Sequence, residues 1–133
     1  MIADSSAWLE LLRASGSAVH GAMRLAITNK QRIVVPDVVF QEVLQGASSI
    51  RQFEHLRDTL AKLPRFVPED ARQLHEKAAS LYFRCRQAGY TVRRANDCLI
   101  AACAIESGEP LLQRDRDFVH IAAVDKRLIL IPV

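Results

Sequence analysis

Residues 93–105, RRANDCLIAACAI, form a segment that is apolar almost throughout after its first five residues. Its length, together with Gly108 shortly after it, predicts a helix that is buried on most sides. Asp97 lies near the start of this helix, where free backbone N–H groups and the helix dipole favour negative charge. The simplest role for Asp97 is an N-terminal cap. The alternative is that Asp97 meets carboxylates from distant parts of the chain.

Short apolar segments alternate with helical patterns along the rest of the chain. We expect strands at residues 2–3, 32–35, 66–67, 110–113 and 128–131. Helices are expected after Ser5 or Ser6, from Ser17, from Pro36, from Ser48 or Ser49, from Pro68, across Asp97 and at residues 118–122. This alternation predicts an α/β fold in which helices cover both faces of a parallel sheet.

Composition limits the class of protein. The chain has 133 residues, half of them hydrophobic, which fits one domain spanning residues 1–133. No apolar run approaches the ~20 residues of a membrane span, so we expect neither a membrane segment nor a signal peptide. The three cysteines form no CxxC pair and the four histidines lack zinc-ligand spacing, which predicts a reduced, cytoplasmic protein without zinc. The net charge of +3 favours a nucleic-acid partner only slightly.

Carboxylates follow the predicted strands at one edge of the sheet. Asp4 ends the first strand, Asp115 and Asp117 follow the strand at 110–113, and Glu42 lies on the helix after the second strand. Parallel α/β sheets bind ligands beyond the carboxyl ends of their strands, where these groups and Asp97 can meet. Clustered carboxylates repel one another unless a cation lies among them, and oxygen ligands suit Mg²⁺ or Mn²⁺. The set predicts a metal-dependent nuclease or phosphatase.

Four motifs occur in order along the chain. Residues 4–8, DSSAW, are similar to an opening Asp-(Thr/Ser)-Ser-x-Trp, and Glu42 with Gly46 is similar to Glu-x-x-x-Gly. Residues 97–102 are similar to Asp-x-x-Ile-Ala-Ala, and residues 111–118 to Leu-Leu-Thr-x-Asp-x-Asp-Phe. With this set of motifs the chain resembles the PIN-domain family over essentially its whole length. Within that family it resembles the VapC-like ribonuclease toxins of bacterial toxin–antitoxin pairs.

The resemblance implies a three-layer α/β/α sandwich around a central parallel sheet, and an endoribonuclease that uses Mg²⁺ or Mn²⁺. Carried over by motif, Asp4, Glu42, Asp97 and Asp115 form the acidic catalytic pocket, and Asp4, Asp97 and Asp115 hold the metal. Asp117 and Ser6 are secondary candidates. Asp117 can equally be a solvated turn residue or a cap before Phe118, and Ser6 an N-cap.

The resemblance also implies partners: an RNA substrate such as tRNA or rRNA, a cognate VapB-like antitoxin, and a second copy of the chain. Arg93 matches a frequent arginine of the family, and we expect it to hold RNA phosphate; the alternative is charge balance for the acids. Apolar helical surface around Trp8, Leu12, Phe53 and Leu56 is a candidate for the dimer or antitoxin contact.

Two other functions remain open at this point. One is a PIN nuclease of RNA maturation that is not a toxin. The other is a catalytically silent binding module, which only Gln113 favours, because the family usually has Thr or Ser there. The chain contains neither GxGxxG nor a P-loop, so we expect no nucleotide cofactor.

Overall fold

A computed structural model describes residues 1–133 and shows a small, wholly parallel sheet at its centre. Strands β1 (Ile2–Ala3) and β2 (Leu111–Leu112) pair in the register Ile2 with Leu111 and Ala3 with Leu112. Single parallel bridges extend this pair on both sides: Ile2 with Val34, Val35 with Arg65, and Leu111 with Leu130. Numbered along the chain, the five strand segments therefore lie in the order 3-2-1-4-5. This is the order of a doubly wound sheet.

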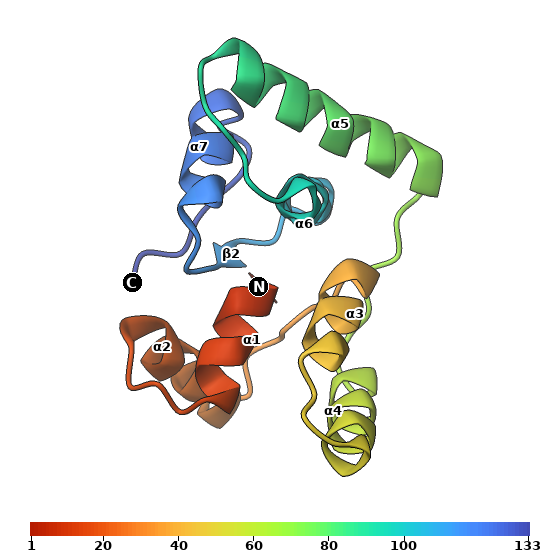
Figure 1. Cartoon of the computed structure of the whole chain (residues 1–133), viewed down its shortest axis with the longest axis vertical. Coiled ribbons are helices and arrows are strands. Elements are labelled where there is room, and N and C mark those ends of the chain that lie inside the picture. Colours follow the sequence, from red (N-terminus) through yellow and green to blue (C-terminus); the bar gives the residue numbers. More distant parts are fainter.

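Seven helices surround the sheet (Figure 1). In Figure 1, α5, α6 and α7 lie on one side of β2, whereas α1, α2, α3 and α4 lie on the other side. The predicted α/β fold with helices on both sides of a parallel sheet is confirmed. None of the helices has both the length and the apolar composition that crossing a bilayer requires. The helices are α1 (Ser5–Leu12), α2 (Ala18–Thr28), α3 (Asp37–Gln45), α4 (Ile50–Ala61), α5 (Ala71–Gln87), α6 (Ala95–Ser107) and α7 (Arg116–Val124).

Helix α6 forms the centre of the hydrophobic core, as its apolar sequence predicts. Cys98 and residues 100–104 are all buried, and the apolar character continues around the helix. Gly108 ends α6 with φ of 70°, a left-handed conformation that glycine adopts without steric cost. The helix is enclosed mainly by α5, α7 and α3, which pack against it.

Several helix and strand boundaries differ from the predictions. Asp4 caps α1, in place of the expected Ser5 or Ser6, and its side chain accepts the Ala7 N–H. Asp70 caps α5, so that helix begins three residues after Pro68. Asp115 caps α7, which begins at Arg116, two residues before the predicted start. In each case an aspartate competed with the predicted start residue for the cap position.

Four strands are also shorter than predicted. Pairing within 32–35 is limited to Val34 and Val35, and pairing within 110–113 to Leu111 and Leu112. The segment at 66–67 pairs only through Arg65, one residue earlier, and the last strand only through Leu130.

Helix α4 packs only part of its apolar residues against the core. Leu56 and Leu60 are buried, but Ile50 is 73% exposed and Phe53 37% exposed. The predicted apolar surface around these helices is smaller than expected, because Trp8 and Leu56 belong to the core. Leu12 and Phe53 remain as its exposed members.

Candidate active site

The site lies where the strand order reverses, between β1 and β2. The Asp4 N–H donates to the Leu112 carbonyl at 3.0 Å, which brings the ends of these two strands together. Asp4 follows β1 directly and Asp115 follows β2 after two residues. This edge is where ligands bind in doubly wound sheets.

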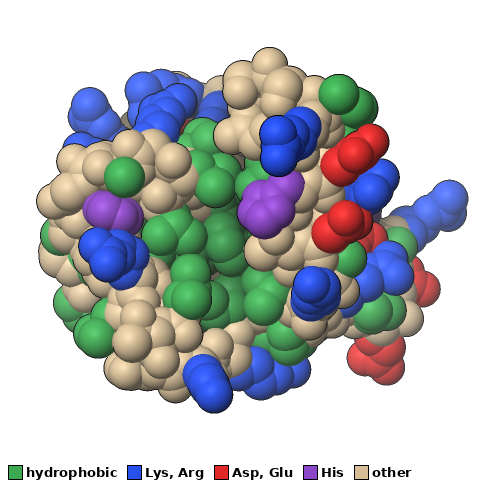
Figure 2. Space-filling model, turned by 90° about the horizontal axis from the view of Figure 1, so that it is seen from below, with side chains coloured by type: hydrophobic (Ala, Val, Ile, Leu, Met, Phe, Trp, Pro, Cys, Tyr) green, Lys and Arg blue, Asp and Glu red, His purple; other side chains and the backbone are tan.

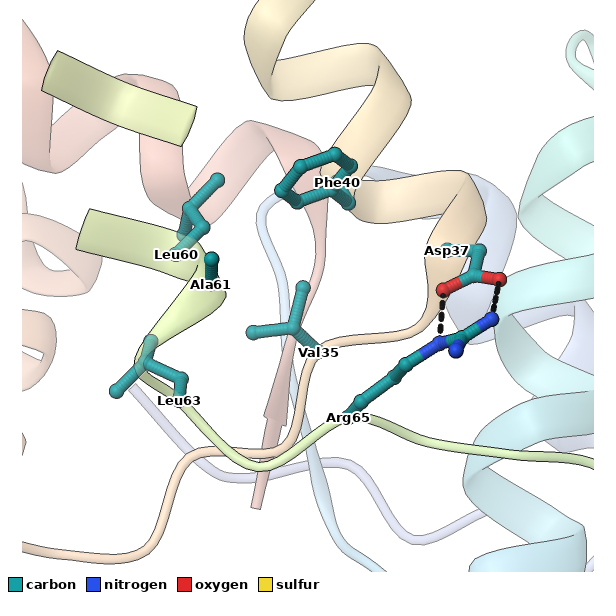
Figure 3. A pocket seen from close by; sticks show the side chains of 7 residues that line it. All are labelled: Val35, Asp37, Phe40, Leu60, Ala61, Leu63 and Arg65. Carbon is teal, nitrogen blue, oxygen red and sulfur yellow. Dashed lines mark hydrogen bonds and ion pairs between the residues drawn. The ribbon is translucent and has the colours of Figure 1, made fainter. Parts of the chain in front are cut away.

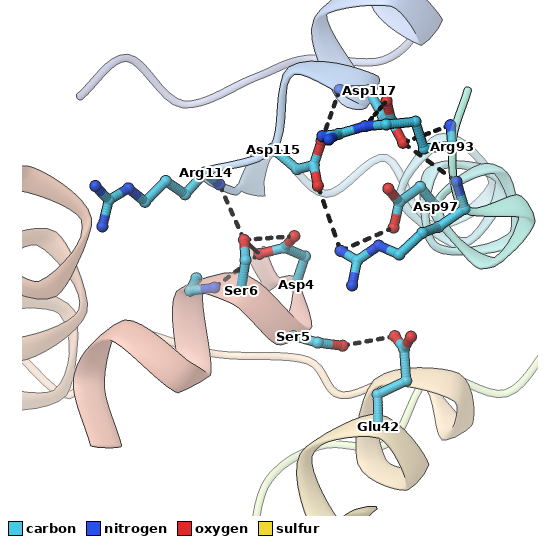
Figure 4. Close-up of polar contacts among 11 residues, drawn as sticks. Asp4, Ser5, Ser6, Glu42, Arg93, Asp97, Arg114, Asp115 and Asp117 are labelled. Carbon is cyan, nitrogen blue, oxygen red and sulfur yellow. Dashed lines mark hydrogen bonds and ion pairs between the residues drawn. The ribbon is translucent and has the colours of Figure 1, made fainter. Parts of the chain in front are cut away.

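Asp4 is buried and firmly held. Its Oδ1 accepts the Ala7 N–H at 2.9 Å, and the Ser6 hydroxyl lies 2.8 Å from both carboxylate oxygens (Figure 4). Burial raises the pKa of Asp4 to about 6, although the bonds from Ala7 and Ser6 oppose that rise. Ser6 therefore orients Asp4, and its alternative role as the N-cap of α1 is not observed. The Ser6 oxygen also accepts the Arg114 N–H at 3.1 Å, which ties α1 to the segment after β2.

Asp97 is the third residue of α6 and is only 1% exposed. The N-cap position is occupied by Arg94, and no side chain caps the helix, so the cap interpretation of Asp97 is wrong. Both Asp97 carboxylate oxygens are buried without a hydrogen bond. Burial raises its pKa to about 7; the Arg94 guanidinium opposes this rise, whereas the nearby charge of Asp115 adds to it. A buried carboxylate without partners is costly unless a cation or proton compensates it.

Asp115 and Asp117 complete a close acidic group with Asp97. One carboxylate oxygen from each of the three residues lies within 4.8 Å of the others. Asp115 caps α7 by accepting the Asp117 N–H at 3.0 Å. Asp117 is buried; its Oδ2 accepts the backbone N–H groups of Arg93 and Arg94 at 3.0 and 3.4 Å, while its Oδ1 has no hydrogen bond. Asp117 is thus neither a solvated turn residue nor a cap.

Glu42 extends from α3 toward the site, on the side opposite Asp115 and Asp117 (Figure 4). The Ser5 hydroxyl donates to Glu42 Oε1 at 2.6 Å, so α1 positions both Asp4 and Glu42. In Figure 4, the Glu42 side chain points from α3 toward the side of the site where Asp4 and Asp97 lie. Glu42 is half-buried and is not a member of the closest acidic group.

Two arginines partly neutralise the acids. Arg93 Nη2 lies 3.2 Å from Asp115 Oδ1, and Arg93 Nε lies 3.8 Å from Asp117 Oδ1. Arg94 Nη2 lies 3.6 Å from Asp97 Oδ1 and 3.5 Å from Asp115 Oδ2. The sequence motifs indicate Arg93 and not Arg94, although the position of Arg94 three residues before Asp97 allows the two side chains to pair. The Arg93 side chain is 63% exposed and remains free to contact a ligand.

The donor set fits a hard divalent cation. Asp97 and Asp117 together present three buried oxygens without hydrogen bonds, and Asp115 adds a partly exposed carboxylate. All donors are oxygens, which Mg²⁺ and Mn²⁺ prefer. Gln113 makes no side-chain hydrogen bond to these carboxylates; its buried Oε1 has no partner.

Comparisons with known proteins agree with this fold. A model of the PIN domain matches residues 1–124. The chain is 38% identical over 125 residues to the VapC ribonuclease Mb1587 of Mycobacterium bovis and to ribonuclease VapC11 of Mycobacterium tuberculosis, covering 93% of this chain and 92% of each relative. A crystal structure of VapBC2 from Rickettsia felis, bound to a DNA fragment from its promoter, contains a similar fold, with a TM-score of 0.70 at 18% identity over 98% of this chain and 96% of that one. The chain belongs to the PIN domain family.

Proposed function

We propose that the protein is an Mg²⁺- or Mn²⁺-dependent endoribonuclease and the toxin of a toxin–antitoxin pair. The observation that carries this proposal is the pair of Asp97 carboxylate oxygens, buried without a hydrogen bond beside Asp115 and Asp117. A purely structural carboxylate at this depth would have hydrogen-bond partners. The VapC ribonuclease names of relatives at 38% identity support the same activity.

The residues take distinct roles in this proposal. Asp97, Asp115 and Asp4 hold the metal, although Asp4 lies outside the closest acidic group, and Asp117 Oδ1, which accepts no hydrogen bond, is a further candidate ligand. When bound, the metal supplies a water of lowered pKa and a positive charge beside the scissile phosphate. In this proposal Glu42, which accepts a hydrogen bond from Ser5, takes a proton from the attacking water. Cleavage would leave a 5′-phosphate and a 3′-hydroxyl.

Cleavage of a structured RNA such as tRNA by the purified protein tests this proposal. We expect cutting with Mg²⁺ or Mn²⁺, none with EDTA, and a loss of at least about 10³-fold for Asp97→Asn, as for other preorganised charged groups. Asp58→Asn is the matched control, because Asp58 is an exposed aspartate of α4 and pairs only with Arg57. Equal cutting by Asp97→Asn and the parent would identify a contaminating nuclease.

Expression in cells, together with the cleavage assay, separates the alternative functions. A toxin arrests growth when expressed alone, and co-expression of the protein encoded next to it restores growth. A nuclease of RNA maturation cleaves RNA without that arrest. A silent binding module leaves every RNA intact even though the parent binds metal.

We propose that the antitoxin partner covers apolar surface on the side of α2 and α4. Seen from that side, the surface is hollowed and lined by hydrophobic side chains (Figure 2). A cavity of about 440 Å³ between α3 and the end of α4 is lined by Val35, Phe40 and Leu60, with the paired Arg65 and Asp37 at its edge (Figure 3). The large exposed apolar side chains of α1, α2 and α4 are Leu12, Leu25, Ile27, Ile50 and Phe53.

A contiguous exposed apolar surface of this kind is typical of a protein contact. We also propose that the protein is a homodimer, as the family resemblance implies. Light scattering across a range of concentrations tests this directly. A monomer at every concentration would contradict the dimer, and loss of antitoxin binding in Phe53→Asp would support the proposed contact.

A further inference from the structure

A second cavity lies directly against the acidic site, on the side of the loop that joins α5 to α6. Its volume is about 460 Å³, within the ~300–1,000 Å³ range of small-molecule sites. Tyr90, Thr91, Arg93, Arg116, Asp117 and His120 line it. Asp117 also belongs to the close acidic group, and Arg93 pairs with both Asp115 and Asp117. The cavity and the acidic site therefore share a wall.

Two aromatic rings are stacked at this cavity. The Tyr90 and His120 ring centroids lie 4.8 Å apart, and the ring planes differ by 12°. Gly89, with φ of 85°, ends α5 and turns the chain so that Tyr90 meets α7. His120 Nδ1 is buried without a hydrogen bond. The stack is a preformed flat surface of the kind on which unpaired RNA bases stack.

The cavity also carries an arginine without a partner. Arg116 is exposed and forms no ion pair, unlike Arg93 beside it. It is the first residue of α7, where the helix dipole disfavours a cation. A cation in an unfavourable position beside an open cavity is explained if an anion binds there. A phosphate of an RNA strand is an anion of the right kind.

We propose that this cavity is a nucleotide subsite for the RNA strand. A base next to the cleaved bond stacks on the Tyr90–His120 pair, and the adjoining phosphate pairs with Arg116. This inference rests on the proposed ribonuclease function and adds a binding site for the strand outside the metal site. Stacking on an aromatic ring tolerates every base, so the subsite fixes the strand's position more than its sequence.

Binding of a short single-stranded RNA tests the subsite without any need for cleavage. The probe is a fluorescein-labelled octanucleotide of mixed sequence, titrated by anisotropy against the full chain carrying Asp97→Asn, in EDTA. In that background Tyr90→Leu removes the ring and keeps an apolar side chain, and Tyr90→Phe keeps the ring. We expect Tyr90→Leu to weaken binding roughly 5- to 100-fold and Tyr90→Phe to bind like the Tyr90 protein. Tyr82→Leu is the matched control, since Tyr82 lies on α5 and contacts Arg86.

The salt dependence of RNA affinity distinguishes the phosphate contact of Arg116 from the stacking contact of Tyr90. Arg116→Gln should flatten the dependence of log affinity on log salt by up to about 0.7, whereas Tyr90→Leu should leave that slope unchanged. Equal affinity of Tyr90→Leu and Tyr90→Phe overturns the stacking role, and an unchanged slope in Arg116→Gln overturns the phosphate contact. Both failures leave the nuclease intact if the parent still cuts RNA. If the parent neither binds nor cuts RNA, the proposed function itself fails.

Discussion

Asp97 and Asp125 are both almost completely buried, at 1% and 5% exposed, yet their surroundings are opposite. Asp125 Oδ1 accepts the Arg127 N–H at 3.1 Å and its Nε at 3.0 Å, and Asp125 Oδ2 accepts from Arg127 at 2.7 Å and Arg84 at 3.0 Å. These bonds from Arg127, with the one from Arg84, hold the pKa of Asp125 well below its usual range. Asp97 accepts no hydrogen bond, and its pKa is raised to about 7. Burial alone therefore does not distinguish the two aspartates; the hydrogen bonds that their carboxylates accept do.

The largest expected difference is in stability. Asp125→Asn should lower the free energy of unfolding by about 2–4 kcal/mol, because Arg84 and Arg127 lose their charged partner. Asp97→Asn should raise it by about 0.5–2 kcal/mol in EDTA, because a repelling charge is removed from the acidic group. Urea unfolding of both variants measures the two changes. Changes of the same sign would show that the two aspartates play the same structural role.

Metal should make the parent more stable than Asp97→Asn, the reverse of the order expected in EDTA. At a concentration 100 times the dissociation constant, Mg²⁺ or Mn²⁺ should stabilise the parent by about 2.7 kcal/mol through mass action. Asp125→Asn should gain as much as the parent, and Asp97→Asn much less. Thermal melting with EDTA and with millimolar metal makes the comparison. A full gain in Asp97→Asn would show that the metal binds elsewhere.

The two aspartates should also respond to pH in different ranges. Asp97 has a raised pKa, so the folded chain holds a proton that the unfolded chain has lost between pH about 4 and 7. Without metal, stability should therefore rise as pH falls through 7, by on the order of 1–2 kcal/mol by pH 5, with Asp4 contributing below about pH 6.

Asp125, whose pKa is lowered, contributes stability that is lost only as pH falls below about 4. Urea unfolding in EDTA at unit intervals from about pH 8 to about pH 3 follows both ranges. In Asp97→Asn the rise near pH 7 should disappear while the part due to Asp4 remains. A rise near pH 7 that survives in Asp97→Asn would assign the titration to another group.

The smallest expected effect is a difference in the salt dependence of RNA binding between variants of Arg93, beside Asp115 and Asp117, and Arg127, beside Asp125. Arg93→Ala should reduce the slope of log RNA affinity against log salt by less than one unit, at roughly 0.7 per phosphate contact. Arg127→Ala should leave that slope unchanged and lower the melting temperature, because Arg127 holds Asp125. Anisotropy titrations at three salt concentrations, well below the melting temperatures, measure the slopes. A slope unchanged in Arg93→Ala would leave Arg93 with charge balance alone.

Local sequence was sufficient to predict most of the fold. The buried helix across Asp97, its glycine stop, and the alternation of strands with helices follow from apolar spacing and cap residues. The exposure of Ile50 and Phe53 did not follow, because the apolar pattern of α4 is the same whether or not a neighbour covers it. The strand lengths also depend on the path of distant segments and not on local sequence.

The candidate site was predicted in outline but not in its closest contacts. Asp4 and Asp115 each follow a strand, as expected, and strand ends of a parallel sheet share one edge, but only Asp115 joins the closest acidic group. Asp117 was underrated because its burial arises where α7 meets the loop before α6. Arg94 was underrated for the same reason, since its two acidic partners come from different helices.

The strand order has a consequence for the protein during its synthesis. Chains leave the ribosome N-terminus first, so β1, with Asp4 at its end, emerges long before β2. β1 lies between strand segments that come from residue 34 and from residue 111, and Asp115 comes later still. A nascent or truncated chain that stops before residue 115 therefore has Asp4, Glu42 and Asp97 but no complete acidic group. A cell that makes this protein is therefore exposed to the complete acidic group only after translation has passed Asp115.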